Sequence, residues 1–239
     1  EDLAYVGSEY NIEKLCIFFG RTEPNPVPDY MLSYRLYPEV HELVVRPLGD
    51  INSDGYDDVG ITVRKYHTDS EFLILDGATM ALVPAGTCMT ASYYKYMCGI
   101  GDANADGYDD YLITRVLHPT SNTHYRITLF FGGESIPPTD SLVITEDTNG
   151  TIDPNVGPLG DLNGDGIDDF VGWVGGAGFR IWYGSSALTP QWDKLVPNNE
   201  YSYNSRVYVL VSGDFNGDGY SDMISSDYLY GSDGSAFMW

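Results

Sequence analysis

Short apolar segments separated by turn-forming residues run through the whole chain. Segments such as 125–131 and 206–212 are rich in β-branched and aromatic residues and last about 5 to 7 residues, as strands do. Gly, Pro, Asn and Asp separate these segments, and no window sustains the 3.6-residue period of an amphipathic helix. The pattern therefore predicts an all-β protein built from short strands.

One acidic segment occurs four times, at 47–58, 99–110, 158–169 and 211–222. A second landmark is an apolar or aromatic strand that ends in Gly, at 17–20, 73–77, 129–132, 181–184 and 228–231. Each unit offers about four strands: one enters the acidic segment, one leaves it, one ends in the Gly landmark, and a fourth is less regular. Four-stranded units of roughly 40 to 60 residues are typical of β-propeller blades.

Five Gly landmarks against four acidic segments indicate that the first unit is incomplete. Residues 1–7 align with 168–174, so the first unit lacks its inner strand and most of its loop, and the last unit leaves little chain for a fourth strand. We therefore expect a single β-propeller-like domain over 1–239, with about five blades and an incomplete first blade. The approximate blade units are 1–40, 41–92, 93–152, 153–204 and 205–239.

Each acidic segment carries oxygen-bearing residues at positions 1, 3, 5 and 9 and Gly at position 6, counted from its leading aspartate. Oxygen ligands on alternate residues of a tight turn suit Ca²⁺, which takes six to eight oxygens, and the backbone carbonyl of position 7 adds another. We predict four Ca²⁺ sites. In order of positions 1, 3, 5, 7 and 9, their ligands are Asp50, Asn52, Asp54, Tyr56 and Asp58; Asp102, Asn104, Asp106, Tyr108 and Asp110; Asp161, Asn163, Asp165, Ile167 and Asp169; and Asp214, Asn216, Asp218, Tyr220 and Asp222.

The same residues also form hairpin turns without any metal, since Asp-Gly and Asn-Gly are strong turn formers. Four groups of carboxylates would repel one another unless a divalent cation neutralised them, which favours the metal. Mg²⁺ demands a tighter octahedral geometry, and the loops lack the Cys and His that zinc or copper prefers. The position-8 residues Asp57, Asp109, Asp168 and Ser221 are expected to point away from the metal, as solvated or turn-capping residues.

The alternation of an aromatic-Gly strand with Gly-Asp-x-Asn-x-Asp-Gly-x-x-Asp resembles the FG-GAP repeat, which is found in integrin alpha-subunit propellers and in many bacterial secreted proteins. The resemblance covers essentially the whole chain. It implies four-stranded blades whose first loop binds Ca²⁺, in an extracellular or cell-surface protein. The chain departs from the family in having about five blades instead of about seven. Its Gly-Ala-Pro half of the motif is also degenerate, with Arg64, Arg115 and 175–176 at the corresponding strand ends.

The net charge of the chain disfavours some classes of binding partner. Twelve Lys and Arg against 35 Asp and Glu give a net charge of −23, which disfavours nucleic acid and acidic lipid. Tyr, Phe and Trp number 20, 9 and 4, too many for a disordered acidic chain, and no apolar run has the roughly 18 residues of a membrane span. The sequon at Asn149 is compatible with secretion.

Candidate catalytic groups are sparse. His41, His67, His118 and His124 are scattered without metal-ligand spacing, so we expect no enzyme, with a polysaccharide-active enzyme as the open alternative. We expect a structural or adhesive module, which either self-assembles head-to-tail into a surface filament or matrix or closes on itself as a monomeric five-bladed propeller. The alternative is a glycan- or protein-binding module of a larger secreted protein.

Some aromatic and cysteine residues have two interpretations. Trp173, Trp182, Trp192 and Tyr203 are candidate ligand contacts, although packing within blades is favoured. Cys16, Cys88 and Cys98 are expected to be free, buried thiols, with pairing of Cys88 and Cys98 as the alternative.

Overall fold

The computed structural model describes residues 3–9, 12–18, 20, 26–35, 40–65, 69–88, 96–118, 124–147, 156–174, 178–197, 206–228 and 235–238. Over these residues the chain forms β-strands and no helix, so the all-β prediction is confirmed for this part of the protein. Consequently, the described chain holds no helix of the length and apolarity that crossing a membrane requires.

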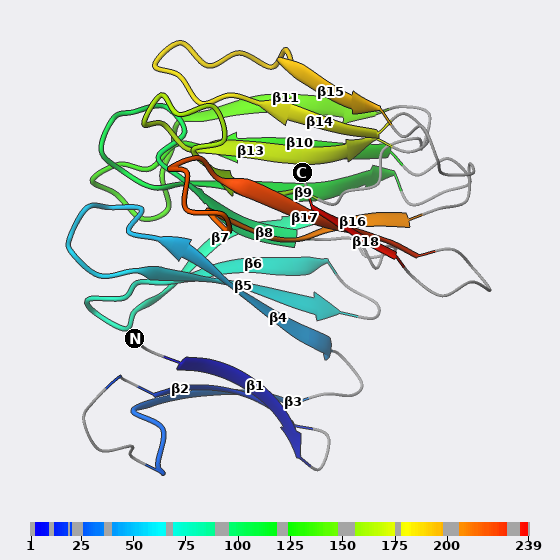
Figure 1. Ribbon diagram of the computed structural model, residues 1–239. Helices are drawn as coiled ribbons and strands as arrows, with labels where there is room; N and C mark the ends of the chain where they lie inside the picture. The colour runs from blue at the N-terminus through cyan, green and yellow to red at the C-terminus, as the bar shows by residue number, and fades with distance from the viewer. Residues whose placement is uncertain are drawn as a thin grey trace.

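The strands form five antiparallel sheets, each made of strands that follow one another in the chain (Figure 1). The first sheet contains β1 (Leu3–Glu9), β2 (Ile12–Phe18) and β3 (Tyr30–Arg35). The second contains β4 (Val40–Gly49), β5 (Asp58–Lys65), β6 (Ser70–Leu75) and β7 (Leu82–Cys88), and the third β8 (Tyr96–Gly101), β9 (Asp110–His118), β10 (His124–Phe130) and β11 (Ser141–Asp147). The fourth contains β12 (Val156–Gly160), β13 (Asp169–Val174), β14 (Gly178–Trp182) and β15 (Lys194–Pro197), and the fifth β16 (Arg206–Gly213), β17 (Asp222–Tyr228) and β18 (Ser235–Met238).

The sheets have the meander order of propeller blades, although a closed ring is not formed by the described residues. The three middle sheets have four strands, and the first and last have three. Their first strands β4, β8, β12 and β16 lie next to one another in chain order, whereas no extensive contact joins the last sheet to the first within the described ranges.

The apolar core lies between neighbouring sheets. Leu48 and Ile51 of the second sheet and its loop pack with Met97 and Tyr111 of the third, and all four are buried. Because each middle sheet has a neighbour on both faces, its second and third strands are buried on both faces instead of alternating with exposed residues. This explains the continuous burial along much of β5 and β6.

Several buried side chains settle alternatives left open by the sequence. Cys98 is a buried free thiol whose pKa burial raises to about 12, whereas Cys16 is free but only partly buried, so the prediction of burial is wrong for Cys16. The side chain of Cys88 lies outside the described residues. Trp182 is 2% exposed and stacks on Phe170 with the ring centroids 5.3 Å apart, which confirms packing for this residue.

Glycine at position 99 is required by the close approach of β8 to β4. A Cβ on Gly99 would lie 2.4 Å from the backbone oxygen of Leu48, and a backbone atom cannot rotate away. We expect Gly99→Ala to destabilise the protein by about 1 to 3 kcal/mol, the usual cost of overpacking. Urea unfolding measures this free energy.

Gly157→Ala is the matched control, because Gly157 also lies on a first strand and a Cβ there meets nothing within 4 Å. Equal effects of the two substitutions would show that the sheets do not approach each other as described.

Candidate metal centre

The four acidic loops join the first and second strands of successive sheets, and they lie at one edge of the molecule, on the left in Figure 1. Backbone hydrogen bonds connect each loop to the next. The N–H of Asp109 donates to the carbonyl of Asp50 at 3.2 Å, and the N–H of Ser221 donates to that of Asp161 at 2.9 Å. The fold therefore brings the predicted sites into one row.

Side chains at positions 1, 3 and 5 of each loop fold back onto the backbone of their own turn. In the first loop, the Asp50 carboxylate accepts the N–H groups of Asp54 at 3.0 Å and Gly55 at 2.8 Å. Asn52 Oδ1 also accepts the N–H of Asp54, and Asp54 accepts that of Tyr56. The other three loops repeat these bonds. The structure thus gathers three of the predicted ligands of each site around one tight turn.

Two residues of each loop have left-handed backbone angles. Position 6 was expected to be such a residue, and its φ is +91° in Gly55 and +86° in Gly166. Position 4 was missed by the sequence reasoning because two of its four residues are not glycine. Ser53 and Ala105 have φ of 56° and 60°, a conformation unfavourable for a residue with a side chain.

The position-9 aspartates Asp58, Asp110 and Asp169 are fully buried and hold the loop to the rest of the sheet. Oδ2 of each accepts an N–H at position 2 of its own loop, at 2.9 to 3.2 Å. Oδ1 accepts the N–H of the glycine that ends the aromatic-Gly landmark, at 2.8 Å in all three; these glycines are Gly77, Gly132 and Gly184. The two sequence landmarks are therefore the two ends of one interaction, which the sequence reasoning found separately and did not connect.

Burial raises the pKa values of these carboxyl groups. The pKa is raised to about 6 in Asp58 and Asp169 and to about 7 in Asp110. The backbone N–H donors oppose this shift, whereas nearby carboxylates such as Asp106 beside Asp110 add to it. The ionised form of these three carboxyl groups is therefore disfavoured, and a nearby cation would stabilise it.

The donor set fits a hard cation, because it consists only of carboxylate, amide and carbonyl oxygens. The carboxylate at position 9 accepts backbone N–H groups. The Asn at position 3 donates from Nδ2 to the carboxylate at position 5. In the described part of the chain, no three side chains of His, Cys, Asp or Glu are grouped as a metal site requires. The geometry thus brings the side chains at positions 1, 3 and 5 together around the turn.

The position-8 aspartates differ from the expectation that they are solvated or cap their own turns. Asp109 and Asp168 are half-buried, and each accepts a hydrogen bond from the preceding loop. Only Asp57 is exposed as expected. The sheets stack closely, and the position-8 side chain of one loop therefore lies against position 1 of the loop in the preceding sheet.

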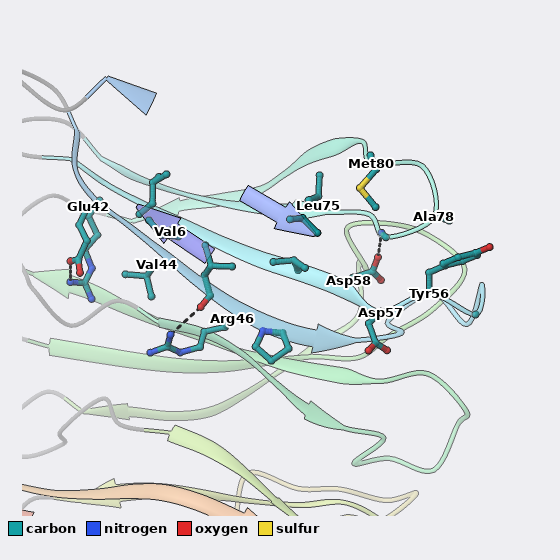
Figure 2. A pocket seen from close by; sticks show the side chains of 18 residues that line it. Val6, Glu42, Val44, Arg46, Tyr56, Asp57, Asp58, Leu75, Ala78 and Met80 are labelled. Carbon is teal, nitrogen blue, oxygen red and sulfur yellow. Dashed lines mark hydrogen bonds and ion pairs between the residues drawn. The ribbon is translucent and has the colours of Figure 1, made fainter. Parts of the chain in front are cut away.

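A pocket of about 1360 Å³ opens beside the first loop, between the first and second sheets (Figure 2). It is lined by Val6 and Ile17 of the first sheet, by β4, and by residues around Tyr56 and Asp57. An ion pair of 2.5 Å between Arg64 and Glu42 closes one end. At the next junction, the buried side chains of β4 and its loop fill the corresponding space.

The chain matches no protein-family model, and no curated protein matches it in sequence.

We expect Asp110→Ala to destabilise the protein even when metal is absent. The substitution leaves the N–H groups of Gly132 and Ala103 without their buried acceptor, at a cost of roughly 3 to 6 kcal/mol for two bonds to a charged group. Asp106→Ala, in the same loop but exposed, is the control and should leave the melting temperature in EDTA nearly unchanged. Thermal unfolding of both variants in EDTA checks this. Similar melting temperatures for the two variants would contradict it.

Proposed function

We propose that this protein is an extracellular, calcium-binding β-propeller module of the FG-GAP type, with a structural or adhesive role and no catalytic activity. The observation that carries the proposal is the fourfold recurrence of one oxygen-lined turn at the same place in successive sheets. A turn that served only as a hairpin connection would need neither three acidic residues nor the same hydrogen bonds in every copy.

Calcium would act in this protein as a structural element. The side chains at positions 1, 3, 5 and 9 and the carbonyl at position 7 would hold it, and the ion would supply positive charge to carboxylates that burial leaves unfavourably charged. Since position 9 also binds the aromatic-Gly turn, an ion at the loop would hold two connections of the same sheet together. Millimolar calcium outside cells would keep such sites filled, which supports the extracellular location. The sequon at Asn149 lies outside the described residues.

We expect removal of calcium to lower the melting temperature, because an ion bound only by the folded state adds its binding free energy to stability. One site contributes about 2.7 kcal/mol when free calcium is 100 times its dissociation constant. Calorimetric titration of EDTA-treated protein should show four sites. Asp54→Ala should remove one, whereas Glu134→Ala, at an exposed residue outside the acidic loops, removes the same charge and should remove none. An unchanged melting temperature in EDTA together with no calcium uptake would contradict the proposal.

A second proposal, head-to-tail contact between copies, is favoured by features at opposite ends of the row of sheets. Phe215, at position 2 of the fourth loop, is 46% exposed, although the corresponding Ile51 and Ala103 are fully buried against the next sheet. The pocket beside β4 is the place where a residue of this position would pack. We propose that β16 and its loop from another copy fill this pocket.

Phe215→Ser should shift the protein toward the monomer by removing the apolar group that enters the pocket. Val143→Ser, at a residue 44% exposed on β11, is the control. Light scattering after size exclusion, in calcium and over a range of protein concentrations, measures the mass. A wild-type protein that is monomeric at every concentration would rule out this contact and leave the alternative of a glycan- or protein-binding module.

A further inference from the structure

The side chain at position 8 of an acidic loop binds the loop of the preceding sheet. Asp109 Oδ2 accepts the N–H of Asp50 at 2.8 Å, and Asp168 Oδ2 accepts the N–H of Asp102 at 3.1 Å. Asp50 and Asp102 are position 1 of their loops, where the first predicted calcium ligand lies. The contact crosses between sheets and connects residues 59 and 66 positions apart in the chain.

A backbone hydrogen bond in the opposite direction accompanies each of these contacts. The N–H of Asp109 donates back to the carbonyl of Asp50 at 3.2 Å, and that of Asp168 donates to the carbonyl of Asp102 at 3.4 Å. The next carbonyl of the first loop, that of Ile51, accepts the N–H of Gly133 at 2.9 Å. The neighbouring sheet therefore fixes the backbone from which the position-1 carboxylate projects.

The glycine before position 1 makes room for this contact. A Cβ on Gly49 would lie 2.0 Å from Asp109 Oδ2, and one on Gly101 would lie 2.1 Å from Asp168 Oδ2. Both glycines also have left-handed φ angles, +81° and +79°. In the first two loops, the glycine before the leading aspartate is thus explained by the side chain that enters from the next sheet.

The first loop supplies an internal comparison. Asp57 occupies the same position 8, but it is exposed, and its side chain makes no hydrogen bond to the residues described. In the fourth loop Ser221 replaces the aspartate and keeps the backbone bond to Asp161. The residue at position 8 therefore forms hydrogen bonds to the preceding loop where that loop lies next to it.

We propose that Asp109 and Asp168 are positioning residues for the calcium site of the preceding loop, not of their own. The inference rests on the proposed calcium function and adds to it that the sites depend on one another in one direction along the row. Residues that orient metal ligands typically change metal affinity 10- to 100-fold when removed. We expect Asp109→Ala to weaken the site at 50–58 by roughly tenfold and to leave the site at 102–110 unchanged.

A double-mutant cycle by calorimetric calcium titration locates the effect. In the Asp54→Ala background, the first site is already lost, so Asp109→Ala should cause no further loss of affinity. In the Asp106→Ala background, the second site is lost, and Asp109→Ala should still weaken one of the remaining sites. The opposite result, an effect that disappears only with Asp106→Ala, would overturn the inference.

Two variants control for charge and for folding. Asp57→Ala removes a position-8 carboxylate that makes no hydrogen bond within the described ranges, and it should change no calcium affinity by more than about twofold, well below the tenfold expected of an orienting contact. Asp109→Asn keeps an oxygen acceptor without the charge and should restore most of the affinity. If Asp109→Ala fails to fold, Asp168→Ala should weaken the site at 102–110 in the same way, and an unchanged site there would overturn the inference.

Hydrogen exchange supplies a readout that needs no metal. In EDTA, the amide of Asp50 should be protected in the wild type and should exchange at least tenfold faster in Asp109→Ala, with the amide of Asp54 as an internal reference. Wild-type protein that binds no calcium would defeat the proposed function and this inference together. Calcium binding that is insensitive to Asp109, with equal exchange at Asp50, would defeat this inference alone.

Discussion

A buried carboxylate that binds two backbone N–H groups, one in its own loop and one after the third strand, is the interaction on which each of the three middle sheets depends. Asp58, Asp110 and Asp169 stand where the loop enters the second strand, and each joins that loop to the turn at the end of the third strand. Water cannot replace the donors because the aspartates are fully buried. Three strands and two connections of a small sheet are therefore held by one side chain, at the electrostatic cost of a buried negative charge.

The cost of burying these charges links the sheet to the acidic loop in front of it. Neighbouring carboxylates add to the effect of burial on the pKa of Asp110, so the same arrangement that organises the turn also disfavours its own ionised state. A cation in the loop would relieve this conflict. In the three middle sheets, the alternation of the two landmarks along the sequence reflects this hydrogen bond, which takes one carboxylate and one glycine N–H from each sheet.

The strand pattern, the four acidic loops and their turn glycines were predictable from the sequence, because they depend on neighbouring residues and on a repeat of fixed order. The partners of Asp58 and Asp109 were not predictable. They lie 19 and 59 residues away, and the pairing depends on how sheets stack. The left-handed angles of Ser53 and Ala105 were also missed, since neither residue type signals that conformation.

Crystals grown in calcium would test the central claim most directly, through anomalous diffraction collected at a wavelength where calcium scatters anomalously. The expected result is one anomalous peak in each loop, surrounded by the oxygens of positions 1, 3, 5 and 9 and by the carbonyl of position 7, at the roughly 2.3 to 2.6 Å typical of calcium. Loops that keep the hydrogen bonds described and show no anomalous peak at millimolar calcium would contradict the claim.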